Sequence, residues 1–214
     1  MTAMESEYPV RLEIDPAASQ NRLTVFFRPI LAIPHWIILA FLGIAAFFVW
    51  LFASLSIVIT ARYPEGLLRF STGVARWATR VAAYGGSPNQ QNIAGTTVYF
   101  VTGGFLTDKY PPFTLGEAPD YPIRLHVQGQ VEGRNRLTGF FPVRIIMLIP
   151  HGIVLIILGI FVTLATIVAW LGGTVLGGLP EWLHNFIAGY TRWSTRVSVY
   201  FGLLVDEYPP FSFN

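Results

Sequence analysis

Two histidines at equivalent places in the chain are the first residues to consider for chemistry. His35 and His151 each close an I-P-H triplet and lie 116 residues apart. Two imidazoles that face one another could bind a metal ion or a haem iron. No acidic or thiol group repeats beside them, because the chain lacks cysteine and the blocks around both histidines lack carboxylates. They are kept as possible ligands, and the alternative is that each marks the start of a helix at a membrane interface.

Basic and aromatic residues also repeat, in two copies of the pattern R-W-x-T-R-V. A guanidinium group binds phosphate through two parallel hydrogen bonds, and tryptophan beside basic residues is typical of the headgroup layer of a membrane. The alternative is a solvated helix face, or salt bridges to nearby carboxylates. The predicted contacts to lipid headgroups are Arg76, Arg80, Arg192, Arg196, Trp77 and Trp193.

The motifs of common catalytic sites are absent from the sequence. It contains no G-x-S-x-G, no H-E-x-x-H, no G-x-G-x-x-G and no glycine-rich loop that ends in Lys-Ser or Lys-Thr. Nucleic acid is not an expected partner, because a membrane explains the aromatic residues beside the arginines. We therefore expect a non-enzymatic protein without catalytic residues, a cofactor or a metal site.

Two long uncharged blocks must position these residues. Residues 29–61 and 145–180 contain no Asp, Glu, Lys or Arg, in a chain that is 53% apolar and 12% charged. Uncharged apolar runs well beyond about 18 residues are typical of membrane segments. A proline fits the first turn of a helix, so Pro34 and Pro150 predict helices that begin near His35 and His151. The expected fold class is therefore mainly α and integral to a membrane.

The length of each block leaves two arrangements open. A straight helix through residues 29–61 would be about 50 Å long, whereas the hydrocarbon layer is about 30 Å thick. Each block is thus either one long tilted span or a short hairpin of two spans. We favour the hairpin, because all arginines would then share the cytoplasmic side, and Gly43 and Gly159 would suit a bend. The expected location is the inner or plasma membrane, multi-pass, with the charged segments mostly cytoplasmic.

The flanking segments repeat as well and divide the chain into two homologous units. Alternating apolar residues predict strands, and arginines at helical spacing predict an interfacial amphipathic helix. A D-x-Y-P-P-F segment follows, whose aromatic residues we expect to pin it onto the strand or the membrane surface. The first repeat is 1–120, with strand 8–14, membrane block 29–61, amphipathic helix 64–84, insertion 85–104 and YPPF end 108–113. The second is 121–214, with strand 121–127, membrane block 145–180, amphipathic helix 181–200 and YPPF end 206–211. We expect the strand of each unit to form a small β-containing cap.

Some features belong to the first repeat alone. The insertion 85–104 is polar and rich in turn residues, and then β-prone at 96–102, which predicts a loop or hairpin that contacts a partner. Two arginines that precede or begin the amphipathic helix also have no arginine counterpart in the second repeat. The candidate partner contacts are Arg62, Arg69, Tyr99 and Phe100.

The I-P-H, R-Y-P-E-G, R-W-x-T-R-V and D-x-Y-P-P-F elements together resemble the family of bacterial and archaeal membrane proteins known as domain of unknown function 4389. The resemblance covers nearly the whole chain in two tandem copies, and the set of motifs is specific although each short motif alone is weak. The second copy has G-L-P-E-W in place of R-Y-P-E-G and Asn185 in place of Arg69, so roles of Arg62 and Arg69 do not carry over to it. The resemblance implies a membrane location and no established activity.

The expected function is that of an accessory, scaffold or regulatory subunit of a larger membrane complex, one that handles or transports lipids. Its partners would be anionic membrane lipids and other integral membrane subunits. The alternative is a stand-alone protein that binds lipid or shapes the bilayer. A small transporter is a third hypothesis, disfavoured because the apolar blocks carry no charge. It would require Ser54, Thr60 or Thr174 to line a shared polar cavity.

Overall fold

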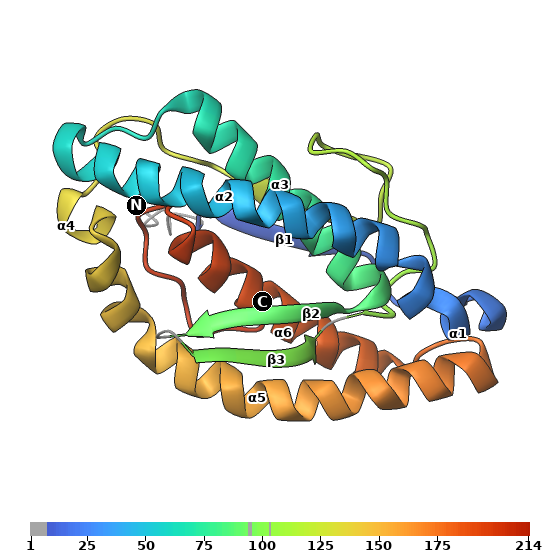
Figure 1. Ribbon diagram of the computed structural model, residues 1–214. Helices are drawn as coiled ribbons and strands as arrows, with labels where there is room; N and C mark the ends of the chain where they lie inside the picture. Colours follow the sequence, from blue (N-terminus) through green and yellow to red (C-terminus); the bar gives the residue numbers. More distant parts are fainter. Residues whose placement is uncertain (1–7, 94–95, 103) are drawn as a thin grey trace, which may run out of the picture.

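The computed structural model describes residues 8–93, 96–102 and 104–214, with the backbone alone described in 87–93 and 96–102. Figure 1 shows long helices on either side of shorter helices, with strand β1 (Val10–Ile14) behind them. The elements in chain order are β1 (Val10–Ile14), α1 (Arg22–Leu31), α2 (Ile33–Thr60), α3 (Glu65–Gly85), β2 (Ser87–Ile93), β3 (Thr96–Thr102), β4 (Ile123–Val127), α4 (Arg136–Gly139), α5 (Phe141–Leu176) and α6 (Glu181–Phe201).

Each uncharged block forms one long helix, so the prediction of short hairpins is wrong. α1 and α2 follow one another as a nearly continuous helix of 39 residues, Arg22–Thr60, and α5 has 36 residues. Gly43 and Gly159 lie inside α2 and α5. A bend there would leave backbone groups unpaired, and neither midpoint has the Pro, Asn or Asp that a tight turn uses. Each long helix ends instead where Ala61 or Gly177 adopts the left-handed conformation, at φ 54° and 77°.

α2 begins at Ile33 with Pro34 in its first turn, as predicted, whereas the start of α5 differs from the prediction. α5 begins at Phe141 rather than near His151, and Pro150 lies in its interior. Pro142 takes the place in the first turn where a proline has no helical hydrogen bond to lose. Ahead of each long helix, Asn21 or Asn135 caps a short one through its side-chain oxygen, which accepts from the two backbone N–H groups that are left open there.

The two amphipathic helices lie between the long helices and the sheet. α3 packs on α2 and α6 packs on α5, while β4 packs on α3 and β1 packs on α6. β1 and β4 are antiparallel, with Leu12 opposite Leu125. In Figure 1 the front layer contains α2, α5 and the hairpin β2–β3, and β1 lies at the back. The strand of each repeat thus covers the amphipathic helix of the other repeat, so the predicted small β-containing cap is a single sheet to which each repeat contributes one strand.

The hairpin β2–β3 is inserted into a helix end that is otherwise the same in both repeats. After α6, Leu203 turns with φ 63° and its backbone N–H donates to the carbonyl of Tyr200. In the first repeat Phe105 has φ 62° and donates in the same way to Tyr84. A Cβ on Gly104, between hairpin and helix end, would lie 2.5 Å from the backbone nitrogen of Gly86. The chain therefore leaves and re-enters the helix end at a point where only glycine fits.

The continuity of α2 can be tested with two glycine substitutions. Gly43→Ala should raise the stability by about 0.5–1 kcal/mol, because alanine loses less backbone entropy in a helix and its Cβ would meet nothing within 4 Å. Gly139→Ala should lower the stability by about 1–3 kcal/mol, because its Cβ would overlap Ile57 where α4 meets α2. Thermal unfolding in detergent measures both, and a large loss with Gly43→Ala would indicate a bend at that residue.

Candidate functional site

The I-P-H, R-W-x-T-R-V and YPPF motifs meet in one aromatic cluster per repeat. Trp77 of α3 donates its indole N–H to Nδ1 of His35 on α2, at 3.0 Å. Phe113 stacks on the other side of the imidazole, with ring centroids 3.9 Å apart, and Tyr110 lies 4.9 Å from it. The histidine ring is fully buried. This contact fixes the angle at which the amphipathic helix crosses the long helix.

The second repeat builds the same cluster from the equivalent residues. Trp193 donates to Nδ1 of His151 at 3.0 Å, and Phe211 stacks on the ring at 3.8 Å. Tyr208 lies 4.9 Å from it, as Tyr110 lies from His35. The YPPF segment therefore packs on the histidine of the long helix. It also contacts the predicted strands, since Tyr8 donates to the carbonyl of Glu207 and Tyr121 donates to the carbonyl of Lys109.

The surroundings of His35 and His151 bear on whether the two imidazoles could bind a metal ion. Because Nδ1 accepts the indole proton, the proton of each imidazole lies on the buried Nε2, and in the second repeat the backbone of Pro209 is an acceptor for the ring of His151. The two rings do not face one another, since each is enclosed by the Trp, Tyr and Phe of its own repeat. Among the described residues, no group of three His, Cys, Asp or Glu could hold a metal ion. The geometry assigns His35 and His151 a role in packing.

A buried arginine in each long helix holds the start of the YPPF segment. Arg28 forms an ion pair with Asp108, and its guanidinium carbon lies 5.2 Å from the ring centroid of Tyr84. Arg144 donates to Asp206 at 2.7 Å and to the carbonyl of Val205 at 2.9 Å. Both arginine side chains are almost fully buried. Arg28 and Arg144 occupy equivalent positions in the two repeats, which the sequence shows. Their pairing with Asp108 and Asp206 could not be predicted from that equivalence.

A second pair of arginines holds the chain that follows the YPPF motif. Arg80 donates to the carbonyls of Thr114 and Gly116, and Arg196 donates to the equivalent carbonyls of Ser212 and Asn214. Facing glycines make room for this chain. A Cβ on Gly73 would lie 2.9 Å from the carbonyl oxygen of Leu115, and one on Gly189 would lie 2.9 Å from Cβ of Phe213.

The third pair of arginines joins each amphipathic helix to the sheet. Arg76 of the first repeat donates from Nε to the carbonyl of Leu125, on the strand of the second repeat. Arg192 of the second repeat donates from Nε to the carbonyl of Leu12, on the strand of the first. Arg76 is also ion-paired with Glu117 at 2.7 Å. These contacts cross between the repeats and tie them together.

These contacts occupy the residues that were predicted to bind lipid headgroups. Trp77, Trp193, Arg80 and Arg196 are buried, with exposed fractions of 8% or less. Arg76 and Arg192 are part-buried against the sheet. Lipid binding by the six residues stays a prediction, and their positions give it no support because the side chains are buried or part-buried and each donates at least one hydrogen bond to the protein.

The predicted partner contacts lie in different surroundings. Arg62 forms an exposed ion pair with Glu132 of the second repeat. Arg69 is exposed on α3, 3.8 Å from Glu65 one turn earlier. Tyr99 and Phe100 belong to β3, where they pair with Gln90 and Asn89 of β2, and their side chains lie outside the described part of the structure. The two arginines are thus exposed, and each forms an ion pair within the chain.

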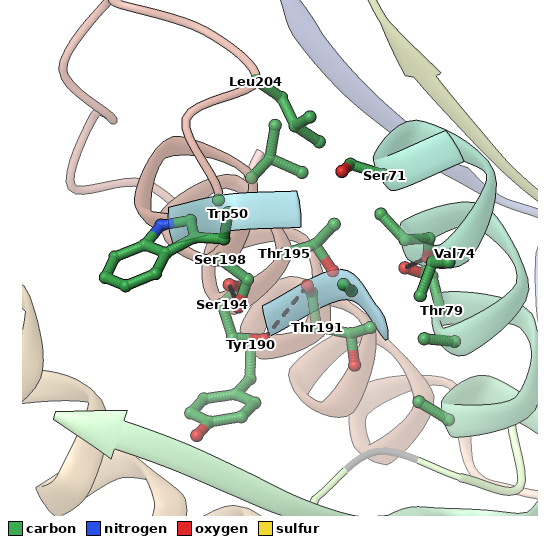
Figure 2. A pocket seen from close by; sticks show the side chains of 16 residues that line it. Trp50, Ser71, Val74, Thr79, Tyr190, Thr191, Ser194, Thr195, Ser198 and Leu204 are labelled. Atoms are coloured by element: carbon green, nitrogen blue, oxygen red, sulfur yellow. Dashed lines mark hydrogen bonds between the residues drawn. The ribbon is translucent and has the colours of Figure 1, made fainter. Parts of the chain in front are cut away.

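A cavity of about 270 Å³ lies where α3 and α6 face one another. Figure 2 shows side chains from both helices pointing into it, with Trp50 of α2 at one side. The lining residues include five pairs at equivalent positions of the two repeats, which are Val74 and Tyr190, Ala75 and Thr191, Ala78 and Ser194, Thr79 and Thr195, and Ala82 and Ser198. The cavity therefore lies between equivalent faces of the two repeats. The sequence did not predict it.

The cavity lining is apolar with hydroxyl groups and without a charged side chain among the described residues. Thr79, Thr191 and Ser198 each donate their hydroxyl proton at 2.8 Å to a carbonyl of their own helix. Hydroxyl lone pairs remain as acceptors. An uncharged molecule with an apolar body and a hydroxyl donor would suit such a lining.

The Trp–His contacts can be tested by removing the indole donor. Trp77→Phe should lower the stability by about 1–3 kcal/mol, because it leaves a buried histidine acceptor unpaired. Trp193→Phe should act alike in the second repeat. Trp182→Phe is the matched control without effect, since Trp182 is 69% exposed. Denaturant unfolding measures the three variants, and equal stability of Trp77→Phe and wild type would contradict the contact.

The pH dependence of stability should report on Asp206. Burial raises its pKa, but hydrogen bonds from Arg134 and Asn135 outweigh burial, so that the pKa lies below its ordinary value. Such a group stabilises the fold fully above the unfolded pKa of about 3.9, and the stabilisation is lost as the pH falls through the lower folded pKa. Asp206→Asn should therefore be less stable than wild type at pH 7, and the difference should shrink below about pH 4.

Thermal unfolding between pH 7 and pH 3 measures this difference. Asp120→Asn is the control, because Asp120 is exposed and has no ion pair within the described residues. A gap between wild type and Asp206→Asn that stays constant over the whole range would rule out the carboxylate as its source.

Comparison with known proteins identifies both copies of the repeat. The family model described as Domain of unknown function (DUF4389) matches residues 22–89 and 141–212. The first matched segment runs from the start of α1 through α3, and the second runs from the start of α5 through α6 and the YPPF end. Neither the curated proteins nor the solved structures give a match. The chain therefore belongs to the DUF4389 family, as two tandem copies of its domain.

Proposed function

We propose that the chain is a non-enzymatic membrane protein that serves as an accessory, scaffold or regulatory subunit of a larger membrane complex. The exposure of the long helices carries the proposal. In the most apolar 18-residue windows of Arg22–Thr60 and Phe141–Leu176, 11% and 39% of the residues are buried. The core helix of a soluble domain would be mostly buried. Surfaces of this size and apolarity need lipid or another membrane subunit to cover them.

The polar residues that repeat support a structural rather than a catalytic role. The histidines, the buried arginines and the aspartates that pair with them all contact other parts of the fold. Arg62 and Arg69, which the first repeat alone carries, remain exposed, with side-chain fractions of 61% and 77%. We place the subunit contact at these two arginines, in the inner or plasma membrane, with the charged segments towards the cytoplasm.

The second candidate is a stand-alone protein that binds lipid, and the cavity between α3 and α6 favours it. Its uncharged lining with hydroxyl acceptors suits the polar end of a neutral lipid. The transporter hypothesis gains no support. Ser54 donates to the carbonyl of Gly139, while Thr60 and Thr174 donate to carbonyls of their own helices, and none of the three lines the cavity.

Native purification separates the two candidates. The protein should remain in the membrane fraction after alkaline washing and should co-purify in mild detergent with a stoichiometric subunit, as measured by native mass spectrometry. Arg62→Gln combined with Arg69→Gln should reduce the yield of that subunit severalfold, whereas Arg136→Gln, another exposed arginine, should not. Recovery of the chain alone with bound neutral lipid would favour the stand-alone protein, and recovery in the soluble fraction would contradict both.

A further inference from the structure

We infer that the long helices lie in the plane of the membrane, within one leaflet, rather than crossing it. This inference rests on the proposed membrane location. Three observations support it. They are the order of the layers (long helices, amphipathic helices, sheet), the position of the charged residues and the length of the long helices.

The charged sheet lies beside the middle of the long helices. Ala46, near the middle of α2, and Ala75 of α3 line the same cavity, and the residue after Ala75, Arg76, donates to Leu125 of the sheet. In the second repeat Tyr190 donates to the carbonyl of Leu155 on α5, and Arg192 donates to Leu12. Leu12 and Leu125 are paired across the sheet. The sheet therefore covers both amphipathic helices near mid-length, at positions that are also close to the middle of the long helices.

Charged side chains cover the outer face of this sheet. The buried residues Val10, Leu12 and Ile14 alternate with Arg11 and Glu13. Two residues of β4 extend the charged face, since Arg124 pairs with Glu13 at 3.0 Å and His126 is half-exposed. If α2 and α5 stood upright in a bilayer, these groups would lie at the depth of the hydrocarbon midplane, where ionised side chains are unfavourable unless they line a protein interior.

The length of the helices gives an independent argument. At 1.5 Å per residue, Arg22–Thr60 is about 58 Å long and Phe141–Leu176 about 54 Å long, whereas the hydrocarbon layer is about 30 Å thick. To keep its whole length within the hydrocarbon layer, a spanning helix of this length would have to tilt by roughly 55° from the membrane normal. Spanning helices tilt by about 0–40°. Exposed apolar residues continue along nearly the whole length, from Leu23 to Ile59 and from Ile146 to Leu176.

A single leaflet fits the layered structure. A helix is about 10–12 Å across, and half of the hydrocarbon layer is about 15 Å, so the front layer of α2, α5 and the hairpin β2–β3 matches one leaflet in thickness. α3 and α6 then lie at the headgroup level, where their exposed Glu65, Arg69 and Glu181 meet water or lipid headgroups. The charged sheet faces the solvent. The occupant of the apolar face is thus the acyl chains of one leaflet.

Spin labels along α5 test this orientation. Ile146, Ile157 and Val168 are exposed by 66%, 52% and 54%, and they lie on one helix face because they are eleven residues apart. The chain has no cysteine, so each position can be labelled singly in the otherwise unchanged protein. Label depth is measured in vesicles of phosphatidylcholine and phosphatidylglycerol, from collisions with oxygen and with a water-soluble nickel chelate. A label at Arg11 on the sheet is the control for a solvent-exposed position.

The in-plane arrangement predicts the same depth at all three positions of α5, within one leaflet. A spanning helix predicts a deep label at Ile157 and shallow labels at Ile146 and Val168, because these two are about 33 Å apart along the helix. That graded result would overturn the inference and leave the membrane location intact. Labels that are all as accessible to nickel as the label at Arg11 would instead overturn the membrane location itself.

Discussion

Four of the five arginines that are buried among the described residues determine how the rest of the chain packs. A buried positive charge is unfavourable unless acceptors surround it. Arg28 and Arg144 find an aspartate at the start of the YPPF segment, and Arg80 and Arg196 find carbonyls after its end. Each segment must therefore turn back along the helices after the amphipathic helix ends. Its phenylalanine then reaches the histidine of the long helix, and the histidine in turn orients the tryptophan of the amphipathic helix.

Because both repeats contain these contacts, they form similar units, and the contacts between them make one body. Arg76 and Arg192 each cross to the strand of the other repeat. The long helices also meet near their ends, where α1 packs on α5 and α4 packs on α2. α3 and α6 are held apart between these contacts, which leaves the cavity at the centre. The hairpin β2–β3 changes one repeat without disturbing this plan, since it leaves and rejoins the chain at a helix end.

Much of this arrangement could be read from the repetition in the sequence, and the rest could not. Equal spacing identified the arginines, the histidines, the tryptophans and the YPPF segments as parts of one unit, and alternation identified both strands. A block that is apolar on all sides has no periodicity to distinguish a hairpin from a continuous helix. The prediction of a bend therefore depended on Gly43 and Gly159, which lie inside continuous helices. The pairing of β1 with β4 also escaped prediction, because it depends on packing between distant segments. The arginines of α3 and α6 were predicted to bind headgroups because their acceptors could not be recognised in the sequence. These acceptors are backbone carbonyls, which every residue carries.

The proposed in-plane orientation of the long helices depends on the contacts between the two repeats, which share one sheet over both amphipathic helices. Formation of a disulfide across that sheet is the most direct measurement. Arg11 and His126 are opposite one another in the register and point to the solvent side. Cysteines at these two positions should join readily within one chain on mild oxidation, as shown by mass spectrometry of the digested protein. Two thiols that both remain open to alkylation, or that join only between chains, would contradict the shared sheet and the layered arrangement built on it.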